Sequence, residues 1–184
     1  MQLREGGQMI DHKMGVQLRK LGKQDIEPTF RWRNTPDIYK WCRQYEPLSD
    51  IKHTQWFEHQ ALDPSIEMYA ITKPSKPLIG VCGLTSIDTI NRHAEFSLYI
   101  GPEHAGEGAG EAALRTLVAH GFHGLNLNMI WGEVFDDNPA LHMFERVGFQ
   151  RDGFRRDMFY RGGKYIGTHM ISLVRGEWIH SRFS

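Results

Sequence analysis

The sequence contains few cysteines, no long apolar segment and no surplus of either charge. Among its 184 residues, Cys42 and Cys82 are the two cysteines, too few for a disulfide framework or a zinc site. We expect both to be reduced thiols in the core, and we expect no metal centre. No apolar run reaches the roughly 18 residues of a membrane helix, and residues 1–14 lack the apolar centre of a secretory signal. We therefore expect a cytoplasmic protein.

The balance of charge argues against several classes of partner. Lys and Arg together number 22, as do Asp and Glu, so the formal net charge is zero. A neutral chain has no general attraction for nucleic acid or for an anionic membrane surface. Hydrophobic residues make up 40% of the chain, which is enough for a packed core. We expect a folded monomer or homodimer whose partner is a small molecule, not a nucleic acid or a membrane.

The order of predicted elements indicates one α/β domain with a sheet of mixed strand direction. Residues 1–14 are polar and aperiodic, so we expect a loose N-terminal arm there and a single domain over 15–184. Apolar–polar alternation and turn signals predict strands over 16–21, 66–72, 78–87, 93–100, 129–135, 153–160 and 165–174. Helices are expected over 26–34, about 36–41, about 52–62 and 139–147, and around the apolar face from Leu114 to Phe122. Asp25 is expected to cap the first of them.

A glycine-rich turn, Gly106-Glu107-Gly108-Ala109-Gly110, joins the strand over 93–100 to a helix. Glycines let the backbone approach an anion, and the first N–H groups of the helix point at that anion with the helix dipole behind them. The turn lacks the Lys-Ser or Lys-Thr of a Walker A loop and the spacing of a dinucleotide fingerprint. From the glycines alone, a phosphate cradle and a plain tight turn both remain open.

The strand and the turn together resemble the acetyl-CoA motif of the GNAT superfamily of N-acetyltransferases. The residues concerned are 95–100 (EFSLYI) followed by 101–114 (GPEHAGEGAGEAAL). Downstream, 127–134 resembles the next strand of the family and 137–149 the helix after it. Residues 153–178 look like the closing hairpin of the ribosomal-alanine-acetyltransferase-like branch. The resemblance covers about residues 16–178.

The resemblance implies a fold and a co-substrate. The fold is a mixed, mostly antiparallel seven-stranded sheet with flanking helices, in which the parallel strands over 93–100 and 129–135 splay apart. Acetyl-CoA is implied as co-substrate, without a metal. Its pantetheine would lie between these strands near Leu98 and Ile100. Its pyrophosphate would take the N–H groups of the turn, that is Ala105, Gly106, Gly108, Ala109 and Gly110.

Three positions depart from the family pattern. Ala105 stands where the family prefers Gln or Arg, and Glu107 where it often has Lys. An acid beside a pyrophosphate is unfavourable, so a weakened affinity for CoA is expected. Asp137 and Asn138 stand where the family has an Asn that contacts pantetheine, and the register favours Asp137 at that place.

Acetyl transfer to an amine needs a base, donors for the oxyanion and a leaving thiolate. By the resemblance, Glu95 is the candidate base; an exposed or structurally paired strand acid is the alternative. His93 lies on the same face of the strand and is a weaker candidate. The family's proton donor is a Tyr where this chain has Phe144. The thiolate therefore leaves unaided or is protonated by another group, such as Tyr99 or Tyr160, unless these are packed aromatics.

The acceptor is suggested by Trp32-Arg33-Asn34 at the end of the first helix. In the resembling branch such a trio lies on the acceptor side, notably in enzymes that acetylate amino-sugar nucleotides. A Trp can stack on a sugar or base, an Arg can hold a phosphate, and an Asn can bind a hydroxyl. A capped helix end with an inward Trp is the alternative. We expect a small primary amine, first an amino-sugar nucleotide. A polyamine, a protein N-terminus and a catalytically silent CoA-binding module remain alternatives.

Overall fold

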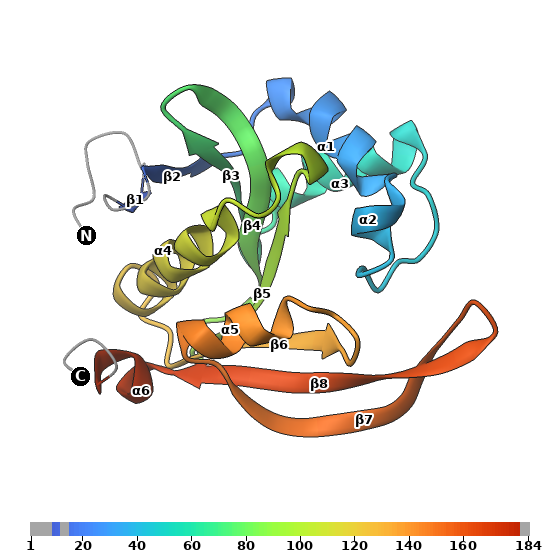
Figure 1. Ribbon diagram of the computed structural model, residues 1–184. Coiled ribbons are helices and arrows are strands. Elements are labelled where there is room, and N and C mark those ends of the chain that lie inside the picture. The colour runs from blue at the N-terminus through green and yellow to red at the C-terminus, as the bar shows by residue number, and fades with distance from the viewer. Residues whose placement is uncertain (1–8, 12–14, 181–184) are drawn as a thin grey trace.

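A computed structural model describes residues 9–11 and 15–180, which form one sheet and its covering helices (Figure 1). The sheet has eight strands in the order β1-β2-β3-β4-β5-β6-β8-β7. The strands are β1 (Met9–Asp11), β2 (Val16–Lys20), β3 (Glu67–Lys73), β4 (Lys76–Asp88), β5 (His93–Ile100), β6 (Met129–Phe135), β7 (Gln150–Arg161) and β8 (Lys164–Val174). Within this sheet β5 and β6 are parallel and the other neighbours are antiparallel. The predicted mixed, mostly antiparallel fold is confirmed, with one strand more than expected.

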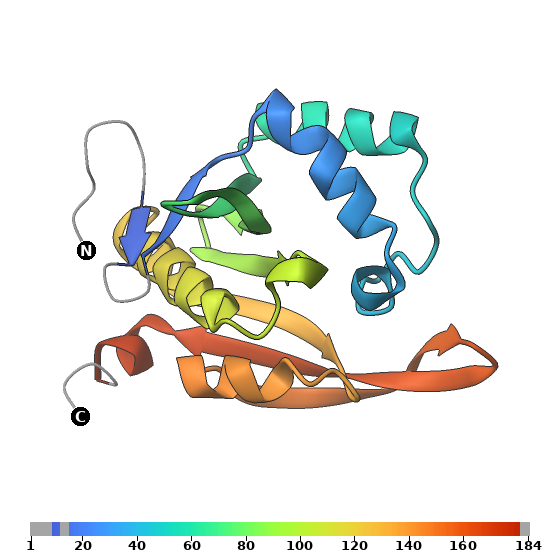
Figure 2. The ribbon, with the colours of Figure 1, turned by 45° about the horizontal axis from the view of Figure 1, so that its top comes forward.

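The helices are gathered in two groups on the sheet. They are α1 (Ile26–Arg33), α2 (Pro36–Tyr39), α3 (Asp50–Leu62), α4 (Ala109–His123), α5 (Leu141–Val147) and α6 (Arg175–His180), with short 3-10 turns η1 (Lys23–Asp25) and η2 (Pro102–His104). α4 packs along β1, β2, β4 and β5, and α5 packs beside it. α1, α2 and α3 form a separate group away from α4 in both views (Figures 1 and 2). None of these helices is long and apolar enough to span a membrane.

The additional strand, β1, lies inside the segment that we expected to be a loose arm. Met9 pairs with Leu18 of β2 and is 2% exposed. Because α4 also contacts β1, this short strand closes one edge of the core. The rest of the predicted arm, residues 1–8 and 12–14, lies outside the described residues.

The core lies between the sheet and α4. Its fully buried large side chains come from both layers and include Leu18, Ile71, Leu84, Leu114 and Ile130. On α4 the buried positions follow the predicted apolar face, because residues three and four apart lie on one side of a helix. Each of the large apolar side chains on this face, Leu114, Leu117 and Phe122, contributes about 1.5–3 kcal/mol on burial, so this layer fixes where β5 and β6 stand.

The sheet opens between β5 and β6. Their ladder ends at Glu95↔Trp131, although β5 stays paired with β4 to Ile100 and β6 stays paired with β8 to Phe135. The ring of Phe96 occupies the point where the two strands part, and a side chain at Gly132 would overlap it. The predicted splay is therefore present, and a glycine opposite an aromatic ring sets where it begins.

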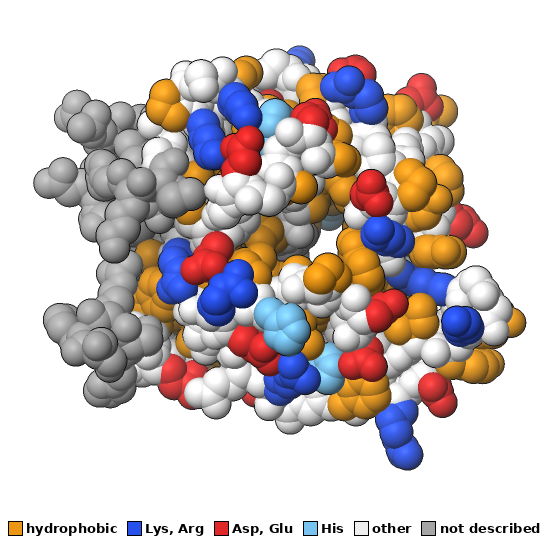
Figure 3. Space-filling view, viewed as in Figure 1, with side chains coloured by type: hydrophobic (Ala, Val, Ile, Leu, Met, Phe, Trp, Pro, Cys, Tyr) orange, Lys and Arg blue, Asp and Glu red, His pale blue; other side chains and the backbone are white. Residues whose placement is uncertain are grey.

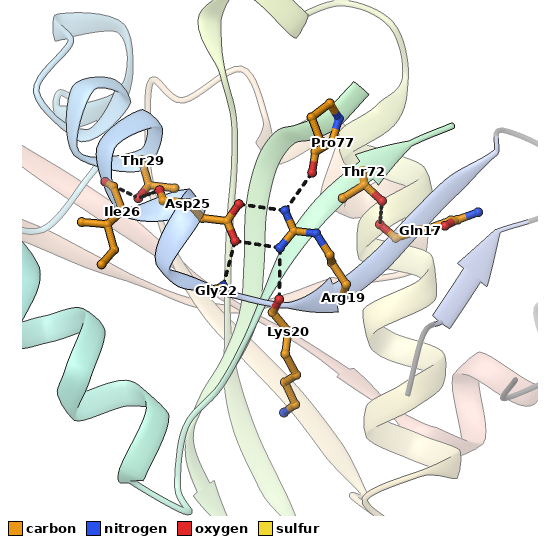
Figure 4. Close-up of polar contacts among 9 residues, drawn as sticks. All are labelled: Gln17, Arg19, Lys20, Gly22, Asp25, Ile26, Thr29, Thr72 and Pro77. Atoms are coloured by element: carbon orange, nitrogen blue, oxygen red, sulfur yellow. Dashed lines mark hydrogen bonds and ion pairs between the residues drawn. The ribbon is translucent and has the colours of Figure 1, made fainter. Parts of the chain in front are cut away.

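Asp25 does not cap α1 through its side chain, contrary to our expectation. Its carboxylate is buried and accepts two hydrogen bonds from Arg19 of β2, at 2.7 and 2.8 Å, and one from the N–H of Gly22 (Figure 4). Arg19 also donates to the carbonyl of Pro77 at the start of β4. A buried carboxylate needs a paired charge, which Arg19 supplies to Asp25. Because Arg19 also bonds Pro77, the ion pair holds β2, η1 and the β3–β4 hairpin together.

Candidate active site

A cavity of about 720 Å³ opens where β5 and β6 separate. Figure 3 shows a hollow between the surface over α1–α3 and the surface over β6 and β8. Residues 95–100 of β5 and 132–135 of β6 form its inner walls. Its outer wall comes from the α2–α3 segment with Trp41, Cys42 and Arg43, and from Lys52 and Trp56 of α3.

Glu95 is the carboxylate of β5 that reaches this cavity. It is 8% exposed and forms an ion pair with Arg43, whose own side chain is 54% exposed. The carboxylate therefore lies at the floor of the cavity and its cation comes from the mouth. His93, two residues earlier, does not line the cavity and lies 3.8 Å from Asp88. Of the two candidate bases, only Glu95 is placed where a substrate could meet it.

A second carboxylate, Glu133 of β6, lines the cavity and was not expected from the sequence. Its side chain is 6% exposed, accepts a hydrogen bond of 2.7 Å from the Thr168 hydroxyl and pairs with Arg155 at 3.2 Å. The alternation of β6 contains the missing signal. Glu133 lies on the same face as Trp131 and Phe135, so a charged residue stands mid-strand between two aromatic residues on a half-buried face.

Two aromatic residues bear on the fate of the leaving thiolate. Phe144 is buried in the cavity wall against Phe96, with ring centroids 5.0 Å apart. Tyr99 also lines the cavity, and burial raises the pKa of its phenol, so the hydroxyl keeps its proton. Such a phenol is a hydrogen-bond donor to a thiolate and a poor acid toward it. Tyr160 is exposed and packs on Tyr165 of the hairpin, outside the cavity.

The residues expected to hold pantetheine divide into two sets. Leu98, Ile100 and Asn138 line the cavity, as does Ala105, which was expected to hold the pyrophosphate. The Asn138 side-chain oxygen accepts a hydrogen bond of 3.0 Å from the N–H of Ala140, which fixes its amide at the cavity wall. Asp137 is exposed and does not line the cavity. Of these two residues the structure therefore puts Asn138 at the cavity wall, whereas the register had favoured Asp137.

The glycine turn has the backbone of an anion cradle. Gly106 (φ +84°) and Gly108 (φ +71°) are left-handed, a conformation that favours glycine, and Gly108 is the N-cap of α4. The first N–H groups of α4 have no acceptor within the helix, so they are available to an anion. Ala109 is buried in the core and can offer only its backbone. Gly110 has room for a methyl group, since a Cβ there would meet Ile100 at an ordinary 3.5 Å.

Glu107 does not stand alone beside this turn. Its carboxylate forms ion pairs with Lys73 at 2.7 Å and with Lys76 at 3.2 Å, both from the β3–β4 hairpin. The hydrogen bond from Lys73, followed by that from Lys76, lowers the pKa of the Glu107 carboxyl. The expectation of an unfavourable acid beside a pyrophosphate overlooked these two cations, which leave the local charge positive.

The Trp32-Arg33-Asn34 trio is split by the structure. Trp32 is 4% exposed, packs on Gly101 and donates from Nε1 to the Glu103 carboxylate at 3.0 Å, so it does not line the cavity. Asn34 exchanges two hydrogen bonds with the backbone of Leu48. Arg33 does line the cavity and contacts the Cys42 sulfur. Trp32 and Asn34 thus have structural partners, and Arg33 alone faces a possible acceptor.

The outer wall of the cavity is held by an arginine from the far hairpin. Arg161 at the end of β7 donates to the carbonyls of Lys40, Cys42 and Arg43, at 2.6 to 3.0 Å. Its buried guanidinium also lies over the Phe135 ring, 4.1 Å from the centroid. Cys42 is therefore a half-buried wall residue and not a core thiol, whereas Cys82 is fully buried and its pKa is raised by burial.

Within residues 9–11 and 15–180, no group of three or more His, Cys, Asp or Glu side chains could hold a metal ion. His120 and His123, which are three apart on α4, gain no third ligand. His120 instead contacts Glu67 at 2.9 Å and Tyr69 at 3.1 Å. The polar side chains that line the cavity include the carboxylates Glu95 and Glu133 and the cations Arg33, Arg43 and Lys52, among aromatic rings.

Comparison with known families shows to which family the chain belongs. The model of the acetyltransferase (GNAT) domain family matches residues 16–150. This chain is a GNAT acetyltransferase. GNAT acetyltransferases use acetyl-CoA as co-substrate, and the chain is accordingly an acetyl-CoA-dependent N-acetyltransferase. The splay, the glycine turn and the cavity are arranged in the way that the resemblance to this family implied.

Several known GNAT proteins resemble the chain over most of its length. The uncharacterized N-acetyltransferase p20 of Bacillus licheniformis is 30% identical over 167 residues, covering 88% of this chain and 93% of that protein. The acetyltransferase PseH of Campylobacter jejuni is 28% identical over 131 residues, or 71% of this chain and 80% of that protein. A crystal structure of spermidine N-acetyltransferase from Vibrio cholerae in complex with CoA and spermine superposes with a TM-score of 0.83 at 26% identity, covering 90% of this chain and 98% of that chain.

Proposed function

We propose that this GNAT acetyltransferase acetylates the primary amine of a small molecule that also carries an anionic group, with an amino-sugar nucleotide as the first candidate. The observation that carries the proposal is the cavity at the splay. It holds a buried carboxylate, Glu95, on its β5 wall and the cations Arg33, Arg43 and Lys52 toward its acceptor side. A carboxylate serves the amine, and cations serve an anion such as a phosphate.

The chain's own groups suffice for the transfer. Glu95 takes the amine proton directly or through a water molecule, as the new N–C bond forms at the acetyl carbon. The backbone N–H of Ile100, which points away from β4 at the freed edge of β5, donates to the oxyanion. The C–S bond then breaks and the electron pair leaves on the thiolate. The Tyr99 hydroxyl, which burial keeps protonated, donates a hydrogen bond to that thiolate.

The cofactor contacts follow the same wall. Leu98 and Ile100 offer their freed backbone to pantetheine, and Asn138 offers its amide. The N–H groups of Gly106, Gly108, Ala109 and Gly110 take the pyrophosphate, because left-handed glycines bring the backbone close to it. The N–H of Ala105 already donates to the Pro102 carbonyl at 3.3 Å. With Phe144 in the wall, no tyrosine is available at the family's usual place for a proton donor.

The charges of the cavity argue for an anionic group on the acceptor and against a polyamine. Glu95 and Glu133, its two buried carboxylates, are already paired with Arg43 and Arg155. A polyamine with several ammonium groups needs unpaired acids, and the third acid of the lining, Asp37 at the rim, is paired with Lys40 at 3.0 Å. Spermidine is the named substrate of some relatives, so this difference is a testable one. Arg33 is the contact we retain from the trio that first suggested a sugar nucleotide.

An acceptor panel tests the proposal. The purified chain is mixed with acetyl-CoA and, in separate reactions, a UDP-amino sugar, spermidine and a peptide with an N-terminal alanine; free thiol and acetylated product are measured. We expect the sugar nucleotide to be acetylated at least tenfold faster than spermidine. Acetylated spermidine or peptide with an untouched sugar nucleotide would overturn the acceptor assignment and leave the N-acetyltransferase standing. CoA binding without any product would favour a silent CoA-binding module, the alternative that Phe144 supports.

Oligomeric state stays a prediction. We expect a monomer or a homodimer in solution, although a spermidine N-acetyltransferase from Vibrio cholerae has a dodecameric structure.

A further inference from the structure

The β3–β4 hairpin ends in two lysines that face each other. Lys73 and Lys76 are the last pair of the ladder, and only Pro74 and Ser75 separate them. Like charges directly opposite one another in a sheet are destabilising. A proline-containing two-residue turn also leaves the pair little freedom to separate. The sequence thus keeps an unfavourable local arrangement, which in proteins often marks a functional position.

The charge of this pair is directed at the glycine turn. Both ammonium groups reach the Glu107 carboxylate, Lys73 at 2.7 Å and Lys76 at 3.2 Å. Glu107 stands between Gly106 and Gly108, the two left-handed residues of the turn. Two lysines from another element therefore lie one side-chain length from the N–H groups that face an anion.

The hairpin is held in this position from behind. Arg19 donates to the carbonyl of Pro77, the residue directly after Lys76, at 2.8 Å. The same guanidinium is locked by two hydrogen bonds to the buried Asp25 (Figure 4). The lysine pair is consequently carried by a fixed backbone, and only the two side chains need to move to meet a ligand.

We propose that Lys73 and Lys76 form a phosphate-binding arm of the acetyl-CoA site, with Glu107 as the group that aligns them. The proposal rests on acetyl-CoA being the co-substrate. CoA carries a pyrophosphate and a ribose 3′-phosphate, and either could meet the arm. Lysine ammonium groups bind phosphate through charge-assisted hydrogen bonds.

A phosphate can take these lysines from Glu107 at little cost. The three side chains are partly exposed, and ion pairs between exposed side chains contribute little because water and salt screen them. A phosphate oxygen offers a stronger hydrogen bond and, as the 3′-phosphomonoester, more charge than one carboxylate. Glu107 thus orients the arm without holding it strongly. Its presence where a lysine is common in the family is explained if the positive charge has moved to the hairpin.

Titration calorimetry with CoA and with dephospho-CoA, which lacks the 3′-phosphate, tests the arm. We expect the double variant Lys73→Ala/Lys76→Ala to bind CoA at least tenfold more weakly than the parent at low salt, and the gap to shrink at high salt. Glu107→Gln should bind CoA about threefold more tightly, because it keeps the acceptor oxygen and removes the competing charge. Lys164→Ala, on the far hairpin, is the matched control and should bind as the parent does.

The two ligands identify the phosphate. If the 3′-phosphate meets the arm, the double variant loses its defect with dephospho-CoA; if the pyrophosphate meets it, the defect remains with both ligands. An unchanged CoA affinity in a double variant that has the parent's melting temperature would overturn the proposal. Failure of the proposed function looks different, since the parent would then bind CoA and form no acetylated amine.

Discussion

At the scale of single residues, ion pairs decide which charged groups are open to chemistry. Glu95 lies at the cavity floor but is paired with Arg43, and Glu107 lies on the glycine turn but is paired with two lysines. In each case the partner comes from a different segment and has the more exposed or more flexible side chain. An incoming substrate can replace such a partner. We infer that a protonated amine competes with Arg43 for Glu95.

A third paired carboxylate, Glu67 of β3, serves stability. It accepts a hydrogen bond from His120 of α4 at 2.9 Å and one from Tyr69, and Lys20 lies 3.7 Å away. The hydrogen bond from His120 lowers the pKa of Glu67 to about 2, and the hydrogen bond from Tyr69 and the charge of Lys20 contribute to the shift. The cluster joins β2, β3 and α4 on the side of the sheet away from the cavity lining.

The depressed pKa predicts how stability depends on pH. Because the folded state holds Glu67 ionised below its ordinary pKa of 4.5, its contribution is complete above pH 4.5 and is lost as the pH falls toward 2. We expect Glu67→Gln to lower the free energy of unfolding by roughly 2 kcal/mol at pH 7, after allowance for solvent screening. The difference from the parent should shrink between pH 4.5 and 2.5. Urea unfolding at several pH values measures this, with the exposed Glu58→Gln as control. A difference that is constant with pH would contradict the assignment.

At the scale of elements, the end of the β7–β8 hairpin closes the cavity from outside. β7 and β8 belong to the half of the sheet beyond the splay, whereas α2 and the α2–α3 segment belong to the other half (Figure 1). Arg161 bridges the two halves by binding three carbonyls of residues 40–43. This bond set positions Arg43, and through it the mouth of the cavity.

Loosening this bridge should weaken acceptor binding selectively. We expect Arg161→Met to raise the KM for the acceptor about tenfold, because three carbonyls lose their donor and the 40–43 segment is no longer fixed. The KM for acetyl-CoA should stay within twofold, since the glycine turn is remote from the hairpin. Arg161→Lys, which keeps the charge but not the forked donor geometry, should lie between the two. Steady-state kinetics with Lys164→Met as control decides this. An unchanged acceptor KM in a folded variant would show that the bridge has no part in binding.

At the scale of the whole molecule, much of the fold could be predicted because its signals are local. The seven expected strands are confirmed with ends that differ by a few residues, as alternation and turn residues lie within each hairpin. β1 has no such signal, since the burial of Met9 depends on α4, a hundred residues away in the chain. The helix α6 is likewise short and was not expected.

The candidate site was harder to predict, because its side chains are oriented by distant partners. The resemblance of residues 95–114 to the acetyl-CoA motif was enough to predict Glu95, Leu98 and Ile100 near the splay, and all three line the cavity. The inward turn of Trp32 depends on Gly101 and Glu103, and nothing in the first helix indicates it. The lysines that meet Glu107 come from a hairpin some thirty residues earlier. A sequence pattern predicts on which face of a strand or helix a side chain lies, whereas tertiary contacts determine which group that side chain meets.

The central claim is that the cavity at the splay carries out acetyl transfer with Glu95 as the base, and Glu95→Gln tests it most directly. The measurement is kcat across pH 6.5–9.5, together with CoA affinity by calorimetry. We expect kcat to fall by about 10²–10⁴ at neutral pH, the loss to shrink as rising pH deprotonates the amine without help, and CoA affinity to stay unchanged. Near-normal turnover at neutral pH in the folded variant would contradict the account and leave Glu95 as no more than the structural partner of Arg43.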